Sequence, residues 1–447
     1  MSNTWDAFYD DEDEEEEVDL RVATQVSKEI IVKPKEEKNE LFLTVINQFK
    51  FLDMKHMLVR NGIMFVVTES QFVRIKPDNN DKMLKETIDL KWKKNFFTPK
   101  KFFADTSGKH AIIISNKNEV VYINNDWQKF RLIADELHPN LQVESVGFND
   151  VGEMEFSQVE LLLGTKDSSI YYIKINAGLE KKFIVTFKKS FSLPVNTLPI
   201  LNISILNYST IAFKTLVFVS SSQKLYCFEG AKLENFFSDY TSKNLNFIEI
   251  KSSPLPKFTS LSFLYDQEEE AKKFIWISED TIMEGEIDIN DLKLKGKKLD
   301  LKYDGKMIGF EITDWHYLIS TKETLFAFNF LDNKKAFQKI MPEKIQPIYS
   351  LCKDRKKNTF HFLSEKYIFN ILPNQEDRNI WDLFLQRKDY ANALKYAKNE
   401  HARETVQCAH ADHLYASGDI EHAAIQYAKS IYYFSFFHYF FFFFNFF

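Results

Sequence analysis

Short apolar runs recur between residues 40 and 373, each followed by two or three polar residues and then by a second apolar run. β-branched and aromatic residues dominate these runs, and this arrangement is typical of β-hairpins. The seven paired runs are 63–67 with 72–75, 111–115 with 120–123, 161–165 with 170–173, 216–220 with 225–228, 274–278 with 282–285, 315–320 with 325–328, and 360–363 with 367–371. The pattern therefore predicts seven successive hairpins.

The hairpins follow one another at a nearly regular spacing, because neighbouring turns lie 43 to 57 residues apart. One four-stranded propeller blade needs about 40–50 residues. Radial repetition also covers each sheet with its neighbours, and closing the ring joins the first blade to the last. We therefore predict a seven-bladed, mainly β propeller over residues 40–373. An irregular stack of β-sandwiches is the alternative, and the blade boundaries stay open because the Gly-His and Trp-Asp dipeptides of WD repeats do not recur at this period.

After Pro373 the apolar positions change to a helical period. The first two predicted helices have apolar faces made by Ile380, Trp381, Leu383, Phe384 and Leu385, and by Ala391, Ala393, Leu394, Tyr396 and Ala397. A third helix is expected near 401–415 and a fourth after Gly418. Asp389 and Asp419 are suited to cap the second and fourth helices, and Gly418 is suited to end the third.

The helical stretch contains an internal repeat. Residues 393–398 (ALKYAK) resemble residues 424–429 (AIQYAK) at an offset of 31 residues, which is the length of one helix-hairpin repeat. Residues 374–430 are therefore predicted to be the first helices of an α-solenoid. Because about three or more repeats are needed for a self-supporting stack, we expect the natural solenoid to continue past Ser430.

The N-terminal segment 1–39 is strongly acidic, with eight consecutive carboxylates from Asp10 to Glu17. Such a block repels itself too strongly to pack, so we expect an acidic disordered tail. A solubilising role and a specific binding arm are both compatible with it. The segment also lacks the positive and apolar regions of a secretory signal, which predicts a cytoplasmic protein.

The C-terminal segment 431–447 contains ten Phe and three Tyr. A solenoid helix would need a polar face, and a transmembrane helix is normally longer and dominated by Leu, Ile and Val. We interpret the segment as a mistranslated intron, in which TTT codons encode Phe. The coding bias agrees, because Arg occurs only eight times among the 58 basic residues. A membrane anchor and a real low-complexity tail are the alternatives.

Charge and composition argue against nucleic-acid binding and against catalysis. Outside the acidic tail the chain is nearly neutral, so it has little electrostatic footprint for nucleic acid. Only 12 Gly are present, and we find no Gly-rich phosphate loop, nucleophile elbow or His-Glu-x-x-His helix. Three widely separated cysteines indicate a reducing compartment without disulfides. We expect no enzyme, no cofactor and no small-molecule substrate.

Two motifs have a possible chemical meaning. Cys408, His410 and His413, with His401 upstream, are residue types that bind zinc, but Cys408 lies about 160° around a helix from His410 and no fourth ligand has metal-motif spacing. Residues 105–108 (DTSG) are similar to the Asp-Thr-Gly of aspartic proteases, yet the inserted Ser favours a tight turn before a strand. We therefore assign no catalytic, cofactor-binding or metal-binding residue.

Several segments resemble the deep-orange family, that of vacuolar protein sorting-associated protein 18, over about residues 40–430. The matching segments are 105–110 (DTSGKH), 143–148 (VESVGF), 162–165 (LLGT), Arg378-Asn379-Ile380-Trp381 with Leu385, Asp389-Tyr390-Ala391 with Ala393, Leu394, Tyr396 and Ala397, and Ala424 with Tyr427-Ala428-Lys429. Members of this family continue into a long solenoid and a C-terminal RING finger. The RING cysteines are absent from this chain, so the resemblance implies neither ubiquitin ligation nor RING-mediated assembly for it.

The resemblance implies a scaffold subunit of the class C complexes HOPS and CORVET, which tether vesicles in endosome-to-vacuole or endosome-to-lysosome transport and membrane fusion. It implies the other class C tethering subunits as partners, and a peripheral location on late endosome, vacuole or lysosome membranes through those partners. The alternative is a propeller-solenoid coat or transport subunit of the clathrin, coatomer or ciliary type, because these proteins share the architecture.

Overall fold

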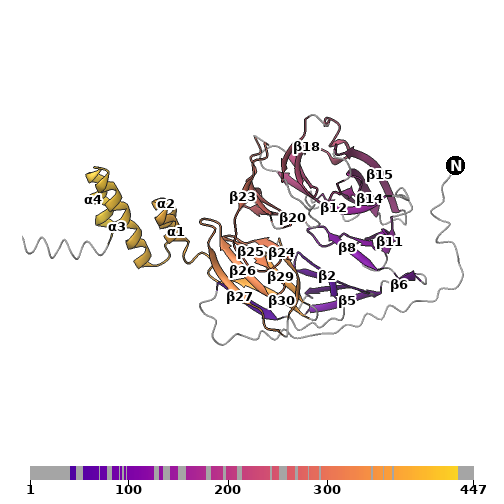
Figure 1. Cartoon of the computed structure of the whole chain (residues 1–447), viewed down its shortest axis with the longest axis horizontal. Coiled ribbons are helices and arrows are strands. Elements are labelled where there is room, and N and C mark those ends of the chain that lie inside the picture. Colours follow the sequence, from indigo (N-terminus) through magenta and orange to yellow (C-terminus); the bar gives the residue numbers. More distant parts are fainter. Residues whose placement is uncertain are drawn as a thin grey trace, which may run out of the picture.

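Seven four-stranded antiparallel sheets are arranged around a centre in the computed structural model, and four helices follow them (Figure 1). The structure describes residues 41–46, 54–69, 71–77, 83–89, 91–92, 95–96, 98–124, 130–133, 141–149, 158–177, 183–194, 198–208, 214–241, 244–250, 259–266, 270–279, 281–290, 293–343, 346–355, 357–364 and 367–430. The expectations for the acidic tail 1–39 and the Phe-rich segment 431–447 lie outside the described residues.

The sheets are the seven blades of a propeller, and the strands of each blade follow one another from its inner to its outer edge. Blade 1 contains β2 (Met54–Arg60), β3 (Ile63–Thr68), β4 (Gln71–Pro77) and β5 (Met83–Asp89). Blade 2 contains β8 (Pro99–Ala104), β9 (Ala111–Ser115), β10 (Val120–Ile123) and β11 (Phe130–Leu132). Blade 3 contains β12 (Val143–Phe148), β13 (Gln158–Thr165), β14 (Ser169–Ala177) and β15 (Phe183–Ser192). Blade 4 contains β16 (Asn202–Tyr208), β17 (Lys214–Ser220), β18 (Lys224–Gly230) and β19 (Asn246–Glu249).

The remaining blades complete the ring. Blade 5 contains β20 (Thr259–Tyr265), β21 (Ala271–Ser278), β22 (Thr281–Glu286) and β23 (Lys297–Leu299). Blade 6 contains β24 (Gly309–Ile312), β25 (His316–Ser320), β26 (Thr324–Asn329) and β27 (Lys335–Ile340). Blade 7 contains β28 (Ile348–Asp354), β29 (Thr359–Ser364), β30 (Ile368–Pro373) and β1 (Phe42–Ile46). The short ribbon β6 (Lys91–Trp92) and β7 (Asn95–Phe96) follows blade 1.

The seven predicted hairpins are confirmed, and each forms the two middle strands of one blade. Middle strands are covered on both faces by neighbouring blades, so their sequences are the most continuously apolar. Two predicted ends were wrong. Trp315 lies in the turn before β25, and Tyr367 lies just before β30, so neither belongs to the strand that was expected to contain it.

The ring is closed by the N-terminal strand. β1 pairs with β30, with Phe42 opposite Pro373, so blade 7 combines the first described strand with three strands from the end of the propeller. The inner strands also contact one another around a complete circle, in the order β2, β8, β12, β16, β20, β24, β28 and back to β2. The alternative of an irregular stack of β-sandwiches is therefore wrong.

The propeller core is distributed between blades. Among the described residues, seven hydrophobic clusters are found, and each joins two neighbouring blades around the ring. Gly147 on β12 shows how closely the blades approach, because a Cβ there would lie 2.6 Å from Cγ2 of Ile203 in blade 4. A side chain at this position would have to displace blade 4, which explains the glycine in the segment 143–148.

The four helices form two antiparallel pairs, α1 (Ile380–Gln386) with α2 (Tyr390–Tyr396) and α3 (Glu400–Ala416) with α4 (Ile420–Lys429). The predicted caps are confirmed, because the side chains of Asp389 and Asp419 accept hydrogen bonds from the third residue after each. Gly418 has φ +87°, as a residue that ends a helix requires. Ala391, expected on the apolar face of α2, is exposed, whereas Ala393 is fully buried.

Candidate functional site

The helices meet the propeller at the turn between β24 and β25 of blade 6. The Trp315 ring in this turn lies edge-on to Phe384 of α1 and to Tyr396 of α2, with ring centroids 6.2 and 4.8 Å apart. Phe384 and Tyr396 stack on each other at 5.6 Å. Such aromatic clusters contribute about 0.5–1.5 kcal/mol per pair beyond the buried area, so the first helix pair is held against blade 6.

A buried carboxylate fixes the same turn. Glu376, in the segment that joins β30 to α1, accepts hydrogen bonds from the backbone N–H of Trp315 at 2.8 Å, from Nδ1 of His316 at 2.8 Å and from the hydroxyl of Thr313. A buried carboxylate is tolerated only where several donors replace its water, and here all three donors come from one turn of blade 6. The direction in which the helices leave the propeller is therefore tied to this turn.

The His316 side chain in this turn also contacts β1, the strand that closes the propeller. It lies edge-on to Phe42 of β1, with centroids 5.8 Å apart, and both side chains are almost fully buried. Outside this buried group, Lys398, which follows α2, forms an ion pair at 2.6 Å with Asp377 in the segment that joins β30 to α1. We call the group Thr313, Trp315, His316, Glu376, Phe384 and Tyr396 the junction.

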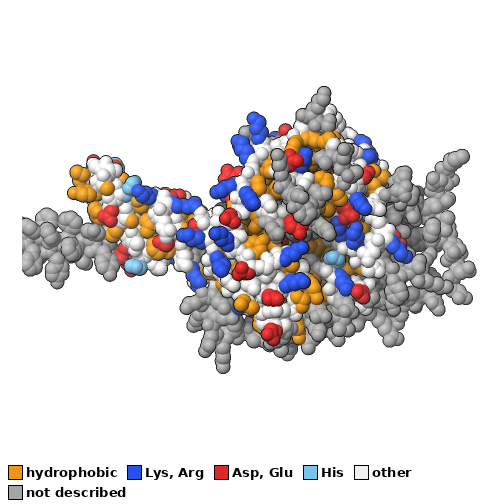
Figure 2. Space-filling view, in the orientation of Figure 1, with side chains coloured by type: hydrophobic (Ala, Val, Ile, Leu, Met, Phe, Trp, Pro, Cys, Tyr) orange, Lys and Arg blue, Asp and Glu red, His pale blue; other side chains and the backbone are white. Residues whose placement is uncertain are grey.

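The far end of the helices has apolar side chains in contact with solvent. Tyr415 on α3 and Ile420 and Ile425 on α4 are 63%, 65% and 45% exposed. Hydrophobic side chains are visible at this tip in Figure 2. Inside the pairs, Ala393, Ala402, Ala411 and Ala423 are buried and let the helices approach closely. This is the packing of an α-solenoid, whose repeats cover one another in sequence.

The centre of the propeller is hollow. The cavity is about 400 Å³ and is lined by the inner strands of all seven blades. Its charged lining residues are Arg60, Glu311, Lys353 and Arg355. Burial raises the pKa of the Glu311 carboxyl to about 7, and burial also lowers the pKa of Lys353. The central cavity is therefore lined by a cluster of four charged side chains that the hydrophobic pattern of the sequence did not reveal.

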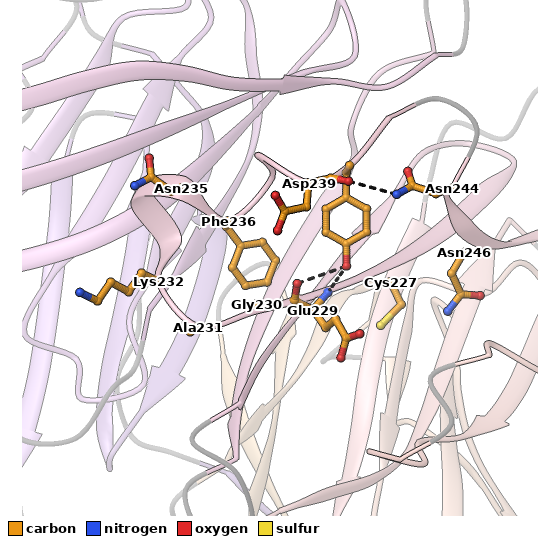
Figure 3. Close-up of a pocket in the computed structure, with 11 residues that line it drawn as sticks. Cys227, Glu229, Gly230, Ala231, Lys232, Asn235, Phe236, Asp239, Asn244 and Asn246 are labelled. Atoms are coloured by element: carbon orange, nitrogen blue, oxygen red, sulfur yellow. Dashed lines mark hydrogen bonds between the residues drawn. The ribbon is translucent and has the colours of Figure 1, made fainter.

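A second hollow, of about 660 Å³, lies beside the outer edge of blade 4 between β18 and the start of β19 (Figure 3). The Tyr240 hydroxyl accepts a hydrogen bond from the backbone N–H of Glu229 at 2.7 Å and donates one to its carbonyl at 3.2 Å. Asn244 also holds this loop, by accepting from the Thr241 backbone N–H at 2.7 Å. The loop covers the end of β18 that β19 leaves open, which is how proteins protect sheet edges.

The residues of the two motifs with a possible chemical meaning have structural roles: one set packs helices together, and the other closes a turn. His410 stacks on Tyr390 at 4.4 Å and His413 lies against the same ring at 5.6 Å, so these imidazoles pack α3 on α2. In the described part of the chain, no group of three or more His, Cys, Asp or Glu is arranged to hold a metal ion. Asp105 accepts hydrogen bonds from the backbone N–H groups of Lys109 and His110, both at 2.9 Å, and closes the predicted turn.

Sequence reasoning missed the junction and the central charges. Glu376 follows the last strand as one of several polar residues, and nothing in its neighbours indicates burial. Arg60 and Lys353 are 293 residues apart, and only ring closure brings them together. Of the helices that the structure describes, none has both the length and the apolar character needed to cross a membrane.

The chain matches the family model described as "Pep3/Vps18/deep orange beta-propeller domain" over residues 42–372. It is 21% identical to the Vacuolar protein sorting-associated protein 18 homolog of Danio rerio over 355 residues, and 24% identical to Vacuolar sorting protein 18 of Arabidopsis thaliana over 361 residues. Each alignment covers 75% of this chain and 36% of the relative. It is also 27% identical over 121 residues to the Vacuolar membrane protein pep3 of Schizosaccharomyces pombe, covering 27% of this chain and 13% of the relative. The chain thus spans about a third of the length of the first two relatives.

Proposed function

Because this chain belongs to the Pep3/Vps18/deep orange family, we propose that it is a non-catalytic scaffold subunit of the class C tethering core found in HOPS and CORVET. In this role it would act in endosome-to-vacuole or endosome-to-lysosome transport and membrane fusion. The observation that carries the proposal is the family match, which runs from β1 to β30 and so covers the whole propeller.

The junction supports a scaffold role. A scaffold has to hold its binding surfaces at fixed positions, and the Glu376 hydrogen bonds with the Trp315 contacts fix the first helices on blade 6. The propeller offers seven blade edges and two rims for partners, whereas the exposed apolar tip of α3 and α4 suits a further helical repeat.

We propose the other class C tethering subunits as partners. The relative from S. pombe is named a vacuolar membrane protein, which supports a place on the vacuolar or late endosomal membrane. We propose that this chain is cytoplasmic and reaches that membrane peripherally, through its partners. We also propose the domain limits 1–39, 40–373, 374–430 and 431–447, with the last segment derived from an intron.

The test is affinity purification of the tagged 447-residue chain from its own cells, followed by mass spectrometry. We expect class C subunits to be recovered. The variant Trp315→Ala should recover fewer of those that bind across propeller and helices, whereas Arg387→Gln, at an exposed site next to α1, should recover as many as the natural chain. Recovery of clathrin, coatomer or ciliary transport subunits without class C subunits would contradict the proposal.

A further inference from the structure

Charged side chains gather at one mouth of the central cavity. The inner strands run in the same direction, because each begins a four-stranded antiparallel blade of the same ring. Arg60 ends β2, Glu311 lies next to the end of β24, and Lys353 lies next to the end of β28. Arg355 follows β28, and its guanidinium lies 3.6 Å from the centre of the Tyr265 ring at the end of β20. Four strand ends from blades 1, 5, 6 and 7 therefore place these groups together.

Positive charge is in excess at this mouth. Of the described residues that line the cavity, three are cationic and Glu311 alone is acidic. The carboxylate of Asp354 does not line the cavity, and it accepts hydrogen bonds from the backbone N–H groups of Asn61 and Gly62 in the β2–β3 turn. Lys353 Nζ donates to the Ile312 carbonyl at 2.7 Å. Within the described residues, no ion pair of 4 Å or less joins Glu311 to these cations.

Arg355 is placed to bind a ligand. A guanidinium that lies over an aromatic ring has its N–H groups in its own plane and pointing away from the ring. These donors can reach a planar or tetrahedral anion with two parallel hydrogen bonds. The cavity wall adds hydroxyl groups from Thr106, Ser204, Ser260 and Ser262. A space of about 400 Å³ enclosed by seven blades suits a compact ligand with several anionic groups better than an extended chain.

We propose that this mouth, which we call the cationic mouth (Arg60, Lys353 and Arg355), binds a compact, multiply phosphorylated small molecule through its phosphate groups. The inference goes beyond the scaffold role and does not depend on it. The same chemistry can come from a soluble inositol polyphosphate or from the headgroup of a phosphoinositide lipid, and the experiment separates these sources.

Glu311 makes the binding sensitive to pH. The charged groups that act on Glu311 are Lys353 from β28 and Arg60 from β2, while Asp314 and Arg355 act on Lys353. Cys352 on β28 also interacts with Glu311, but burial raises the pKa of this thiol to about 12, so it stays neutral. Because burial raises the pKa of Glu311 to about 7, acidification below pH 7 removes the one acidic charge of the lining. An anion whose own charge is unchanged should then bind more tightly, since fewer negative charges oppose it.

The experiment is isothermal titration calorimetry of the 447-residue chain with inositol hexakisphosphate, in buffer free of divalent cations. We expect saturable binding that Arg355→Gln weakens at least tenfold and that Arg355→Lys weakens less. Arg387→Gln, which removes an exposed arginine that does not line the cavity, should not change it. Glu311→Gln should tighten binding several-fold at pH 8 and have little effect at pH 5.5. Circular dichroism melts confirm that each variant is folded.

Flotation with phosphatidylcholine vesicles that contain phosphoinositide assigns the source. Vesicle binding that Arg355→Gln abolishes indicates a lipid headgroup, whereas soluble binding without flotation indicates a free inositol polyphosphate, and both support the proposal. The proposal is overturned if inositol hexakisphosphate gives no saturable heat, or if Arg355→Gln binds as tightly as the natural chain. It is also overturned if a polyglutamate peptide binds as tightly at the same residues, because the site would then recognise carboxylates.

Discussion

Replacing Glu311 by Gln should stabilise the protein at alkaline pH. The carboxyl loses its hydration at the wall of the central cavity, and the attraction of Lys353 and Arg60 does not fully replace it, so its pKa rises from 4.5 to about 7. A raised carboxyl pKa contributes stability below the unfolded pKa near 4.5, and this contribution is lost as the pH rises through 7. At pH 8 the ionised Glu311 therefore lowers the free energy of unfolding.

The magnitude follows from the shift. Each pKa unit corresponds to about 1.4 kcal/mol, so a rise from 4.5 to about 7 sets an upper limit of about 3 kcal/mol at pH 8. The Glu311 side chain is partly accessible from the cavity, and solvent reduces the effect, so we expect about 1–2 kcal/mol. For a chain of this size, that corresponds to an increase of about 1–3 °C in Tm.

The assay is thermal unfolding of the natural chain and of Glu311→Gln at pH values from 5 to 8. The difference in Tm should be smallest at pH 5 and should grow up to pH 8. Glu343→Gln is the matched control, because Glu343 is exposed and its substitution should leave Tm unchanged at every pH. A difference that stays constant from pH 5 to 8, or a variant that is less stable at pH 8, would refute the reasoning.

Three further predictions concern the ring and the junction. Glu376→Ala removes the acceptor of three buried donors, so it should lower the free energy of unfolding by about 2–4 kcal/mol and expose the link to α1 to limited proteolysis; unchanged cleavage would argue against a fixed junction. Phe42→Ala should cost about 3–5 kcal/mol in chemical denaturation, because this fully buried ring belongs to the strand that closes the propeller; a loss below about 1 kcal/mol would show that β1 is dispensable. Of the three thiols, Cys408 should react with a disulfide reagent at pH 8, whereas Cys227 and Cys352 should react only on unfolding, because burial raises each pKa to about 12; rapid reaction of all three would disprove this.

The hairpins and helix caps of this protein could be predicted from residues that are close together in the sequence. Each middle hairpin is identified by its own apolar run and turn, because both faces of these strands are buried whichever blade lies beside them. The caps at Asp389 and Asp419 likewise act within three residues. The outer strands were harder to identify. β27 alternates between exposed and half-buried residues and β23 has three residues, so their apolar patterns are weak.

The candidate sites depend on contacts between distant residues. Glu376 meets His316 across 60 residues, and Arg60 meets the Lys353 carbonyl across 293 residues. The first pair needs blades 6 and 7 to be packed side by side, and the second needs the ring to be closed, because only then are blades 1 and 7 neighbours.

The sequence by itself determined the seven hairpins, the four helices and their caps, because short-range hydrophobic periodicity and local hydrogen bonds specify these elements. Only the tertiary structure decided three features: the closure of the propeller by Phe42 and its strand, the burial of Glu376, and the charge of the cationic mouth. The physical reason is that desolvation and charge pairing depend on which groups surround a side chain, and in this protein those groups come from elements that are distant in the sequence.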